Sequence, residues 1–425
     1  MMRLFPLFIA QLLTVQAIWP QPKTIEQGNT PIILSKDFKI IPSKRLINQF
    51  NLSKDLKLAI NKTLEFIRND HHRPLKIDRD ESVKKIIKKD YQIVLDTLEL
   101  RITYSKSNNW LMNSFKNYYW SWKNDDEMIN LNEIKDEIRK PLNDRDESYE
   151  IQIGKDQFET RDCVTFHGFI EASNALGLLR GLQTFSQLVY ATNITTNHQE
   201  VNKVVNQEET PKENVDEEQK SEENEKEEEG EEEVNTFQYL YGPITIKDSP
   251  SFPYRGILLD TSRNYYPIPD LLRTIEVMSW SKLSTFHWHI VDAQSWPLEI
   301  PHLPDLSKKG AYSNKEIYTI NDVKNVIEFA NSLGIDVMIE IDSPGHTSII
   351  GESFVDLIAC KDFQPWNLFA AEPPAGQLRI ADENALELIE SIYGFVCDQF
   401  PGTLFSSGGD EVYIQYLKLI QNQMT

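Results

Sequence analysis

Residues 255–260 read Arg-Gly-Ile-Leu-Leu-Asp, a short apolar run that ends in an acid. Similar runs recur at 285–290 (Thr-Phe-His-Trp-His-Ile), 335–341 (Ile-Asp-Val-Met-Ile-Glu-Ile) and 403–407 (Thr-Leu-Phe-Ser-Ser). Such runs are typical of buried parallel strands. Each is followed by a segment expected to be a helix, at 270–282, 321–333, 384–400 and 412–420. Four strand–helix units predict an α/β fold with a parallel sheet, as in the first half of a (β/α)8 barrel of the TIM type.

Polar side chains stand at the carboxyl end of every predicted strand. In chain order they are Asp260 and Arg263, His289 and Asp292, Glu340, Asp342 and His346, and Asp410 and Glu411. In a barrel these ends form one face, which is where active sites assemble. The adjacent acids Asp410 and Glu411 could also be solvated residues at a helix start. The convergence of four strand ends favours a catalytic pair, and two carboxyl groups are the minimal equipment for cleaving a glycosidic bond.

The segment before the predicted barrel has a different pattern of expected strands and helices. Strands are expected at 32–34, 38–41, 92–103 and 149–153, and helices at 55–66 and 169–190. These elements predict an α+β domain over 18–201, and residues 236–253 would close it and lead to the barrel at 254–425. Two insertions interrupt this plan. The first, at 105–146, is rich in Asn and Trp, and the second, at 202–235, is acidic and of low complexity.

The net charge of −21 is concentrated in the second insertion. Residues 208–233 hold fifteen acids and three lysines, which gives −12 there and leaves −9 elsewhere. The insertion has too few apolar residues to order itself, so a solvated surface loop is expected, with a pro-segment or a docking tail as alternatives. A strongly acidic chain is repelled by phosphates, which argues against nucleic acid as a partner.

The N-terminus is typical of a secretory signal peptide over residues 1–17. Three glycosylation sequons, at Asn51, Asn61 and Asn193, fit the same route. The sequence therefore predicts a secreted or secretory-pathway protein, with the vacuole and the cell wall as further destinations. The apolar run of the signal is too short to span a membrane, and no other stretch approaches the necessary length, so no membrane anchor is expected.

The cysteines and histidines allow two further predictions. Of the three cysteines, Cys360 and Cys397 are expected to pair because both lie in the later domain, which leaves Cys163 free. His287 and His289 share one face of a strand and could hold a metal ion. Only eight histidines exist and no Cys or His cluster completes a ligand set, so no metal and no cofactor are expected.

Taken together, these motifs resemble glycoside hydrolase family 20, the β-N-acetylhexosaminidases. The matching strings lie at 255–263, 287–292, 340–346 and 408–412, and the string at 181–188 resembles the family's N-terminal α+β domain. The resemblance runs from about Trp19 to the end and is interrupted by the two insertions. Asn264, Ala293 and the Ser406–Ser407 pair depart from many relatives and look closest to fungal members.

The resemblance implies an exo-acting glycosidase of carbohydrate metabolism, which removes terminal β-linked N-acetylhexosamine with retention of configuration. In this mechanism the sugar's own acetamido group attacks its anomeric carbon, and an oxazolinium ion forms. Glu411 matches the general acid, and Asp410 matches the residue that orients the acetamido group. Asp292 and His346 match a hydrogen-bonded chain to the acid, and Arg263 matches the residue that binds sugar hydroxyls. The preference for GlcNAc or GalNAc, and for chitin fragments or glycoproteins, stays open.

The resemblance ends at Thr425, after four of the barrel's eight strand–helix units. The tryptophans, tyrosine and acids that later strands of the family supply are therefore not among these residues. A half barrel exposes two sheet edges, so a second copy or a partner chain could be needed to complete it. The alternatives are a truncated, inactive sugar-binding or interaction remnant, and a metal-dependent hydrolase that uses His287 and His289.

Overall fold

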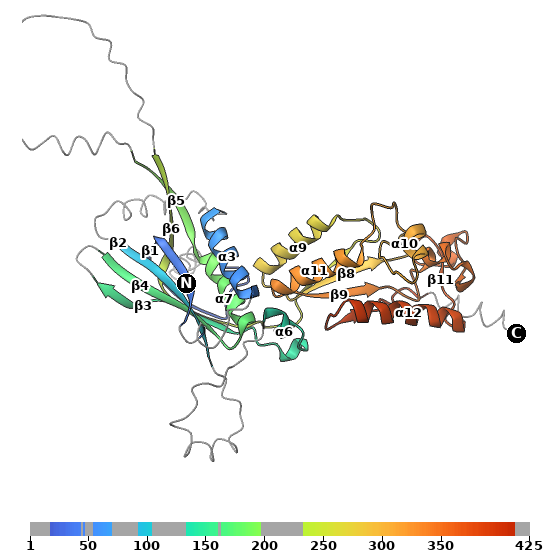
Figure 1. Ribbon diagram of the computed structural model, residues 1–425, viewed down its shortest axis with the longest axis horizontal. Helices are drawn as coiled ribbons and strands as arrows, with labels where there is room; N and C mark the ends of the chain where they lie inside the picture. Colours follow the sequence, from blue (N-terminus) through green and yellow to red (C-terminus); the bar gives the residue numbers. More distant parts are fainter. Residues whose placement is uncertain are drawn as a thin grey trace, which may run out of the picture.

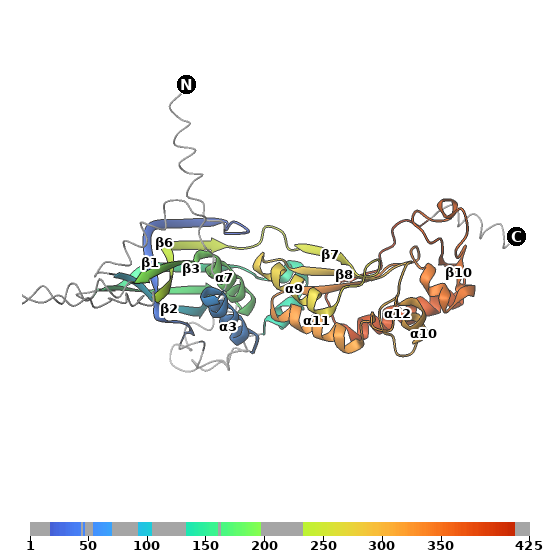
Figure 2. The ribbon, with the colours of Figure 1, turned by 90° about the horizontal axis from the view of Figure 1, so that it is seen from above.

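The computed structural model describes residues 18–43, 46, 54–69, 92–103, 133–159, 163–196 and 233–412, which form two bodies placed end to end (Figure 1). Outside these residues lie the predicted signal peptide, Asn51, most of the insertions at 105–146 and 202–235 and, apart from Val412, the helix expected at 412–420. The first body contains one mixed sheet with helices on one side, and the second contains a parallel sheet (Figure 2). This arrangement confirms an N-terminal α+β domain followed by an α/β domain.

The sheet of the first body has six strands in the order β1-β2-β4-β3-β6-β5, with an added pairing between β1 and β6. The strands are β1 (Thr24–Pro42), β2 (Gln92–Ile102), β3 (Tyr149–Glu159), β4 (Cys163–Ala172), β5 (Tyr190–Thr196) and β6 (Glu233–Asp248). The two runs expected at 32–34 and 38–41 form the single strand β1. Apolar side chains of these strands pack against α3 (Lys54–Asn69) and α7 (Ala175–Leu188) to form the core of this domain. The short helices α6 (Ile134–Ile138) and η1 (Leu142–Asp144) complete it.

The helix expected at 169–190 is shorter than the sequence pattern indicated. Residues 169–172 are the end of strand β4, where Ile170 is buried on the helix-facing side. The helix starts after Asn174, whose side chain accepts a hydrogen bond from the backbone of Gly177 at 2.9 Å. Gly181 lets α7 approach the strand, since a Cβ there would overlap Ile170. The prediction was wrong at this boundary because Phe and Ile fit the helical spacing while they also favour strands.

The second body contains four parallel strands in the order β12-β9-β8-β7. They are β7 (Gly256–Asp260), β8 (Thr285–Val291), β9 (Asp336–Ile341) and β12 (Phe405–Ser406), and the last is shorter than the expected 403–407. The helices α9 (Ile268–Trp280), α11 (Ile320–Ser332) and α12 (Glu383–Gln399) follow β7, β8 and β9 and pack on the sheet with a continuous apolar core. This confirms the repeated strand–helix units over the described residues.

Several short elements lie between the carboxyl ends of the strands and the helices, and the sequence pattern gave no sign of them. They are α10 (Asp305–Gly310), η2 (Ser348–Glu352), η3 (Val355–Leu357), β10 (Ile358–Ala359), η4 (Trp366–Leu368) and β11 (Gln377–Leu378). Figure 1 shows α10 and β11 at the end of the molecule away from the first body. They build a wall beside the carboxyl ends of β8 and β9.

Buried ion pairs join the two bodies. Glu147 lies 2.6 Å from Arg180 and 2.7 Å from Arg255, and Arg180 also donates to the carbonyl of Gly334 at 2.7 Å. Arg145 lies 2.9 Å from Asp336, the first residue of β9. These charges are taken out of water, and each has a partner, as buried charges require. The first body therefore holds the amino end of the parallel sheet.

The expected disulfide between Cys360 and Cys397 is wrong, because both are free thiols in the structure. Cys360 is half-buried in the loop after β10 and Cys397 is exposed near the end of α12.

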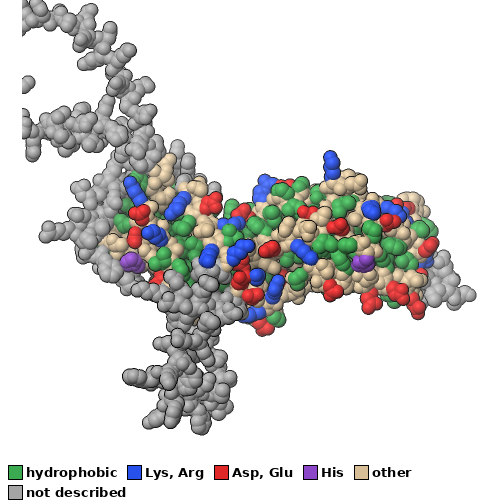
Figure 3. All heavy atoms as spheres, in the orientation of Figure 1, with side chains coloured by type: hydrophobic (Ala, Val, Ile, Leu, Met, Phe, Trp, Pro, Cys, Tyr) green, Lys and Arg blue, Asp and Glu red, His purple; other side chains and the backbone are tan. Residues whose placement is uncertain are grey.

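Two of the sequon asparagines, Asn61 and Asn193, have exposed side chains. Acidic and basic side chains are interspersed over the face seen in Figure 3. Within the described ranges, no helix combines the length and apolar character needed to cross a membrane.

Candidate active site

The polar residues expected at the strand ends converge on the carboxyl edge of the parallel sheet. Side chains of His289 in β8 and Glu340 in β9 point to this edge, where Nδ1 of His289 lies 2.7 Å from Oε1 of Glu340. Asp292 and Asp342 follow directly after these strands and are each 1% exposed. Because neighbouring parallel strands end at the same level, residues far apart in the sequence come together here.

Glu411 is joined to the interior by a chain of contacts through one histidine. Nε2 of His346 lies 2.9 Å from Oε2 of Glu411. On its other side, Nδ1 of His346 lies 3.3 Å from Oδ2 of Asp292 and 2.8 Å from Oδ2 of Asp342. The Asp342 contact does not meet hydrogen-bond geometry and is therefore an ion pair. These contacts link Glu411, whose side chain is 40% exposed, to two acids with fully buried side chains, Asp292 and Asp342.

The backbone at this site is held in unusual conformations. His346 and Glu411 each have φ of 51°, in the left-handed region that side chains other than glycine disfavour. Gly408 also has positive φ, and a Cβ there would overlap the carboxylate of Asp342. The amide of Gly409 donates to Oδ1 of Asp342 at 2.9 Å. The loop after β12 is thereby fixed against the loop after β9, which brings Glu411 to His346.

Arg263 lies among three carboxyl groups from different segments. Its Nη1 is 2.9 Å from Oδ2 of Asp260 and 2.9 Å from Oδ2 of Asp292, and its Nη2 is 3.2 Å from Oε2 of Glu372. Burial lowers the pKa of Arg263, but the charges of Asp292 and Asp260 outweigh it and raise the pKa. Glu372 is half exposed, at 51%, so this contact is the one most open to replacement by a ligand.

Charge pairing sets the protonation of the interior groups. Hydrogen bonding to Asp292 and the contact with Asp342 raise the pKa of His346 to about 11. Burial would raise the pKa of Asp292, but hydrogen bonds from His289 and His346 overcome this and lower it to about 2. Burial would lower the pKa of His289, yet its bonds to Asp292 and Glu340 raise it to about 9. Near neutral pH both histidines are therefore cations and Asp292 is a carboxylate.

His287 and His289, the pair considered for a metal, both contact Glu340. Two sets of side chains among the described residues come close enough to share an ion, one with His289, Glu340 and Asp342 and one with Asp292, Asp342 and His346. In both sets a histidine nitrogen already faces a carboxylate oxygen, at 2.7 Å between His289 and Glu340 and at 2.8 Å between His346 and Asp342.

The structure brings together four of the five residues expected to act on substrate, which are Glu411, His346, Asp292 and Arg263. Asp410 stands beside Glu411 with an exposed side chain, and its carbonyl packs near Gly345. Asp342 was expected at a strand end, but without a role in the site. Glu372 was not expected at the site, since it lies in a loop without periodicity, 109 positions from Arg263.

Comparison with known protein families agrees with this geometry. A model described as the catalytic domain of glycosyl hydrolase family 20 matches residues 252–424. A second model, described as beta-acetyl hexosaminidase like, matches residues 18–188. The two matches cover both bodies of the structure. The chain belongs to glycoside hydrolase family 20.

Curated relatives come from insects, plants, mammals and fungi. A chitooligosaccharidolytic beta-N-acetylglucosaminidase of Bombyx mori is 36% identical over 278 residues, which is 65% of this chain and 39% of the relative. Beta-hexosaminidase 1 of Arabidopsis thaliana is 35% identical over 267 residues, covering 63% of this chain and 39% of the relative. The chain thus spans about two fifths of the length of these relatives. A special likeness to fungal members stays a prediction.

Solved structures show the same fold. A family 20 beta-N-acetylhexosaminidase from Streptomyces coelicolor matches 96% of this chain and 64% of its own, with a TM-score of 0.55 and 19% identity. An exo beta-N-acetylglucosaminidase from Vibrio harveyi, solved in complex with N-acetylglucosamine, matches 96% of this chain and 50% of its own, with a TM-score of 0.53 and 16% identity.

Proposed function

We propose that this chain carries the catalytic residues of an exo-acting β-N-acetylhexosaminidase, which releases terminal non-reducing β-linked GlcNAc or GalNAc. The observation that carries the proposal is the chain of contacts from Glu411 through His346 to Asp292, at the carboxyl edge of a parallel sheet. It provides an accessible carboxyl group that is held beside a positively charged histidine. Family membership and the names of the relatives support the substrate class.

In the first step the acetamido oxygen of the terminal sugar attacks its own anomeric carbon, while the bond from that carbon to the leaving oxygen breaks. Glu411 gives its proton to the leaving oxygen, and an oxazolinium ion forms. His346 stays protonated in this step, because the carboxylates of Asp292 and Asp342 hold its charge, and its Nε2 remains 2.9 Å from Oε2 of Glu411.

In the second step Glu411, now a carboxylate, takes a proton from water, and the hydroxide attacks the same anomeric carbon. The acetamido oxygen leaves and the sugar is released with its original configuration. The arrangement in the structure, with protonated His346 beside Glu411, suits this step because the imidazolium stabilises the carboxylate. Asp292 and Asp342 keep the imidazole oriented throughout.

Asp410 and Arg263 complete the proposed site by binding the sugar. The exposed carboxylate of Asp410 accepts a hydrogen bond from the acetamido N–H, which orients the attacking oxygen and stabilises the positive charge that develops. Arg263 donates to hydroxyl groups of the sugar. Since Nη1 is engaged by two buried or half-buried acids, Nη2 is the group available once Glu372 gives way.

We further propose that strands from elsewhere extend the parallel sheet. Strands β7 and β12 are its edges within the described residues, and Ile257 and Leu258 of β7 are 42% and 52% exposed. Apolar side chains on an open edge favour pairing with another strand. A longer chain, a second copy or a partner chain could supply those strands.

Secretion is a separate proposal, and its support is the signal-like sequence at 1–17 together with the sequons. The exposed side chains of Asn61 and Asn193 are accessible for glycosylation. An extracellular, cell-wall or vacuolar location fits an enzyme that acts on chitin fragments or glycoproteins.

The proposed activity is tested with a thiazoline that mimics the oxazoline intermediate. Binding of the thiazoline, and inhibition of sugar release by it with no effect of a chelator, would support acetamido-assisted hydrolysis. Binding of the thiazoline without release of any N-acetylhexosamine would identify a sugar-binding remnant. Loss of activity with the chelator would instead identify a metal-dependent hydrolase.

A further inference from the structure

His289 lies behind the contacts that lead to Glu411, and the proposed mechanism gives it no role. Its ring is held between two acids, with Nε2 at 2.7 Å from Oδ2 of Asp292 and Nδ1 at 2.7 Å from Oε1 of Glu340. A carboxylate oxygen only accepts hydrogen bonds, so a proton is required on both ring nitrogens. The geometry therefore makes His289 a cation that donates from Nε2 to Asp292.

Glu340 fixes the orientation of the His289 ring. Its second oxygen, Oε2, accepts from Oγ of Ser406 at 2.6 Å and contacts Nε2 of His287. Burial would raise the pKa of Glu340, but hydrogen bonds from His287 and His289 overcome this and lower the pKa. Because both oxygens are engaged, Glu340 cannot turn without losing a contact. Nδ1 of His289 therefore stays toward Glu340, and Nε2 stays toward Asp292.

Oδ2 of Asp292 is the oxygen at which groups from three strand ends meet. It lies 2.7 Å from Nε2 of His289, 2.9 Å from Nη1 of Arg263 and 3.3 Å from Nδ1 of His346. The other oxygen, Oδ1, accepts from the amide of Ala293 at 2.5 Å. Burial would raise the pKa of Asp292, and the hydrogen bond from His289 is the strongest of the contacts that lower it. His289, which also makes the shortest contact of the three, therefore decides where Oδ2 lies.

His289 can influence the proposed acid only through other residues. Its side chain is 8% exposed, and among the described residues it makes no hydrogen bond or ion pair with Glu411. Arg263 and His346 belong to the proposed site, and both contact the oxygen that His289 holds. An effect of His289 on hydrolysis therefore passes through Asp292.

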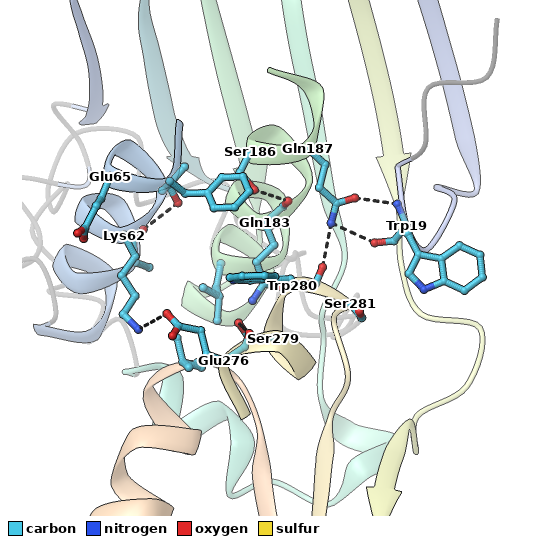
Figure 4. A pocket seen from close by; sticks show the side chains of 15 residues that line it. Trp19, Lys62, Glu65, Gln183, Ser186, Gln187, Glu276, Ser279, Trp280 and Ser281 are labelled. Carbon is cyan, nitrogen blue, oxygen red and sulfur yellow. Dashed lines mark hydrogen bonds and ion pairs between the residues drawn. The ribbon is translucent and has the colours of Figure 1, made fainter. Parts of the chain in front are cut away.

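Other polar contacts in the chain have an evident structural role. At the junction of the two bodies, Lys62 lies 3.1 Å from Glu276, and Gln187 donates to the carbonyl of Trp280 at 2.8 Å (Figure 4). These contacts join α3 and α7 of the first body to α9 of the second. The contacts of His289 join no bodies, and they lie at the carboxyl edge of a sheet whose strands are already paired by backbone hydrogen bonds.

We propose that His289 is a positioning residue for the proposed acid, because it holds Oδ2 of Asp292 beside His346, which in turn contacts Glu411. The inference rests on the proposed function for its effect on hydrolysis. The hydrogen bonds that carry it are measurable without substrate, so the two can fail separately. A purely structural role for His289 predicts a less stable chain in which the bond from His346 to Asp292 is unchanged.

Two substitutions of His289 separate its two contacts. The amide nitrogen of glutamine reaches about as far as Nε2, so His289→Gln keeps a donor for Asp292. The amide nitrogen of asparagine reaches only about as far as Nδ1, so His289→Asn removes that donor. The readout is proton and nitrogen NMR of the 425-residue chain, labelled with ¹⁵N in the rings of its eight histidines. The signals of His346 are assigned by their loss in His346→Gln.

In His289→Asn we expect the Nδ1–H signal of His346 to shift and its proton to exchange with water at least about tenfold faster, because Asp292 is no longer held. His289→Gln should keep the native signal. Lys62→Met, which removes a contact at the junction, is the control and should leave the signal unchanged. An unchanged signal in folded His289→Asn, or equal effects of the two substitutions, would overturn the proposal. A native chain in which Nε2 of His289 carries no proton would overturn it without any variant.

Kinetics of chromophore release from an N-acetyl-β-glucosaminide provide the second readout. His289→Asn should lower kcat by at least about tenfold, since a shift of about 1 Å misplaces a catalytic group. The rise in KM should be smaller, because Arg263 keeps Asp260 and Glu372 as partners. His289→Gln should lie closer to the native chain, and an equal fall of kcat in both variants would contradict the proposal. If the native chain releases no sugar, the proposed function fails while the NMR signals still decide the role of His289.

Discussion

His346 and Glu411 meet at 2.9 Å between Nε2 and Oε2, and both have a left-handed backbone with φ of 51°. Each such conformation costs about 1–3 kcal/mol and persists only where the surroundings enforce it. Here the surroundings are the buried acids Asp292 and Asp342 and the glycines before Glu411. The strain is concentrated at the proposed acid and at the histidine that contacts it.

Replacement of the proposed acid tests this relationship. Glu411→Gln keeps the size of the side chain but can neither give nor take the proton, so kcat for an N-acetyl-β-glucosaminide should fall by about 10²–10⁴-fold. Steady-state kinetics measure it. Glu387→Gln, at an exposed position on α12, is the control and should leave kcat unchanged. An unaltered kcat in Glu411→Gln would assign the acid to another residue.

Gly408, which packs against Asp342, is expected to be required for the position of Glu411. In Gly408→Ala the new methyl group overlaps the carboxylate of Asp342, and φ of 60° adds strain. Activity should therefore fall by at least about tenfold, because a shift of about 1 Å is enough to misplace a catalytic group. Gly394→Ala is the matched control, since nothing lies within 4 Å of its Cβ and it sits inside helix α12. The control should be neutral or stabilising by up to about 1 kcal/mol.

His346 should make stability depend on pH above neutrality. Its pKa is raised from 6.5 to about 11 in the folded chain, so its stabilisation is complete below pH 6.5 and is lost as the pH rises toward about 11. Between pH 7 and pH 9 the free energy of unfolding should fall by at most about 1.4 kcal/mol per pH unit more in the native chain than in His346→Gln. Urea unfolding at these pH values measures it, and equal slopes would contradict the assigned pKa.

Asp292 acts in the opposite pH range. Its pKa is lowered from 3.8 to about 2, so its contribution is present above pH 3.8 and is lost as the pH falls toward about 2. Asp292→Asn should therefore lose stability at pH 5 and should show a weaker dependence on pH between 4 and 2 than the native chain. Thermal unfolding at low pH reports both.

The junction of the two bodies should depend on Arg180. Arg180→Met leaves the Gly334 carbonyl without this donor and leaves Glu147 with Arg255 as its remaining partner, so the free energy of unfolding should fall by about 3 kcal/mol. Arg139→Met, at an exposed position near the end of α6, should change it by less than about 0.5 kcal/mol. Equal effects of the two substitutions in urea unfolding would show that the junction contributes little.

The strand–helix units could be predicted because short apolar runs alternate with amphipathic segments, and the site residues because they stand at strand ends. The position of Glu372 beside Arg263 could not be predicted, since it depends on the path of a long loop. The end of β4 was misassigned because Phe169 and Ile170 suit both periodicities. The pairing of Cys360 with Cys397 failed because membership of one domain says nothing about the distance between two side chains.

The most direct measurement is chromophore release by the 425-residue chain from an N-acetyl-β-glucosaminide and from the matching β-glucoside. Acetamido-assisted hydrolysis through Glu411 predicts turnover of the acetylated sugar alone, and its loss in Glu411→Gln. Equal turnover of both sugars, or turnover that survives Glu411→Gln, would contradict the account.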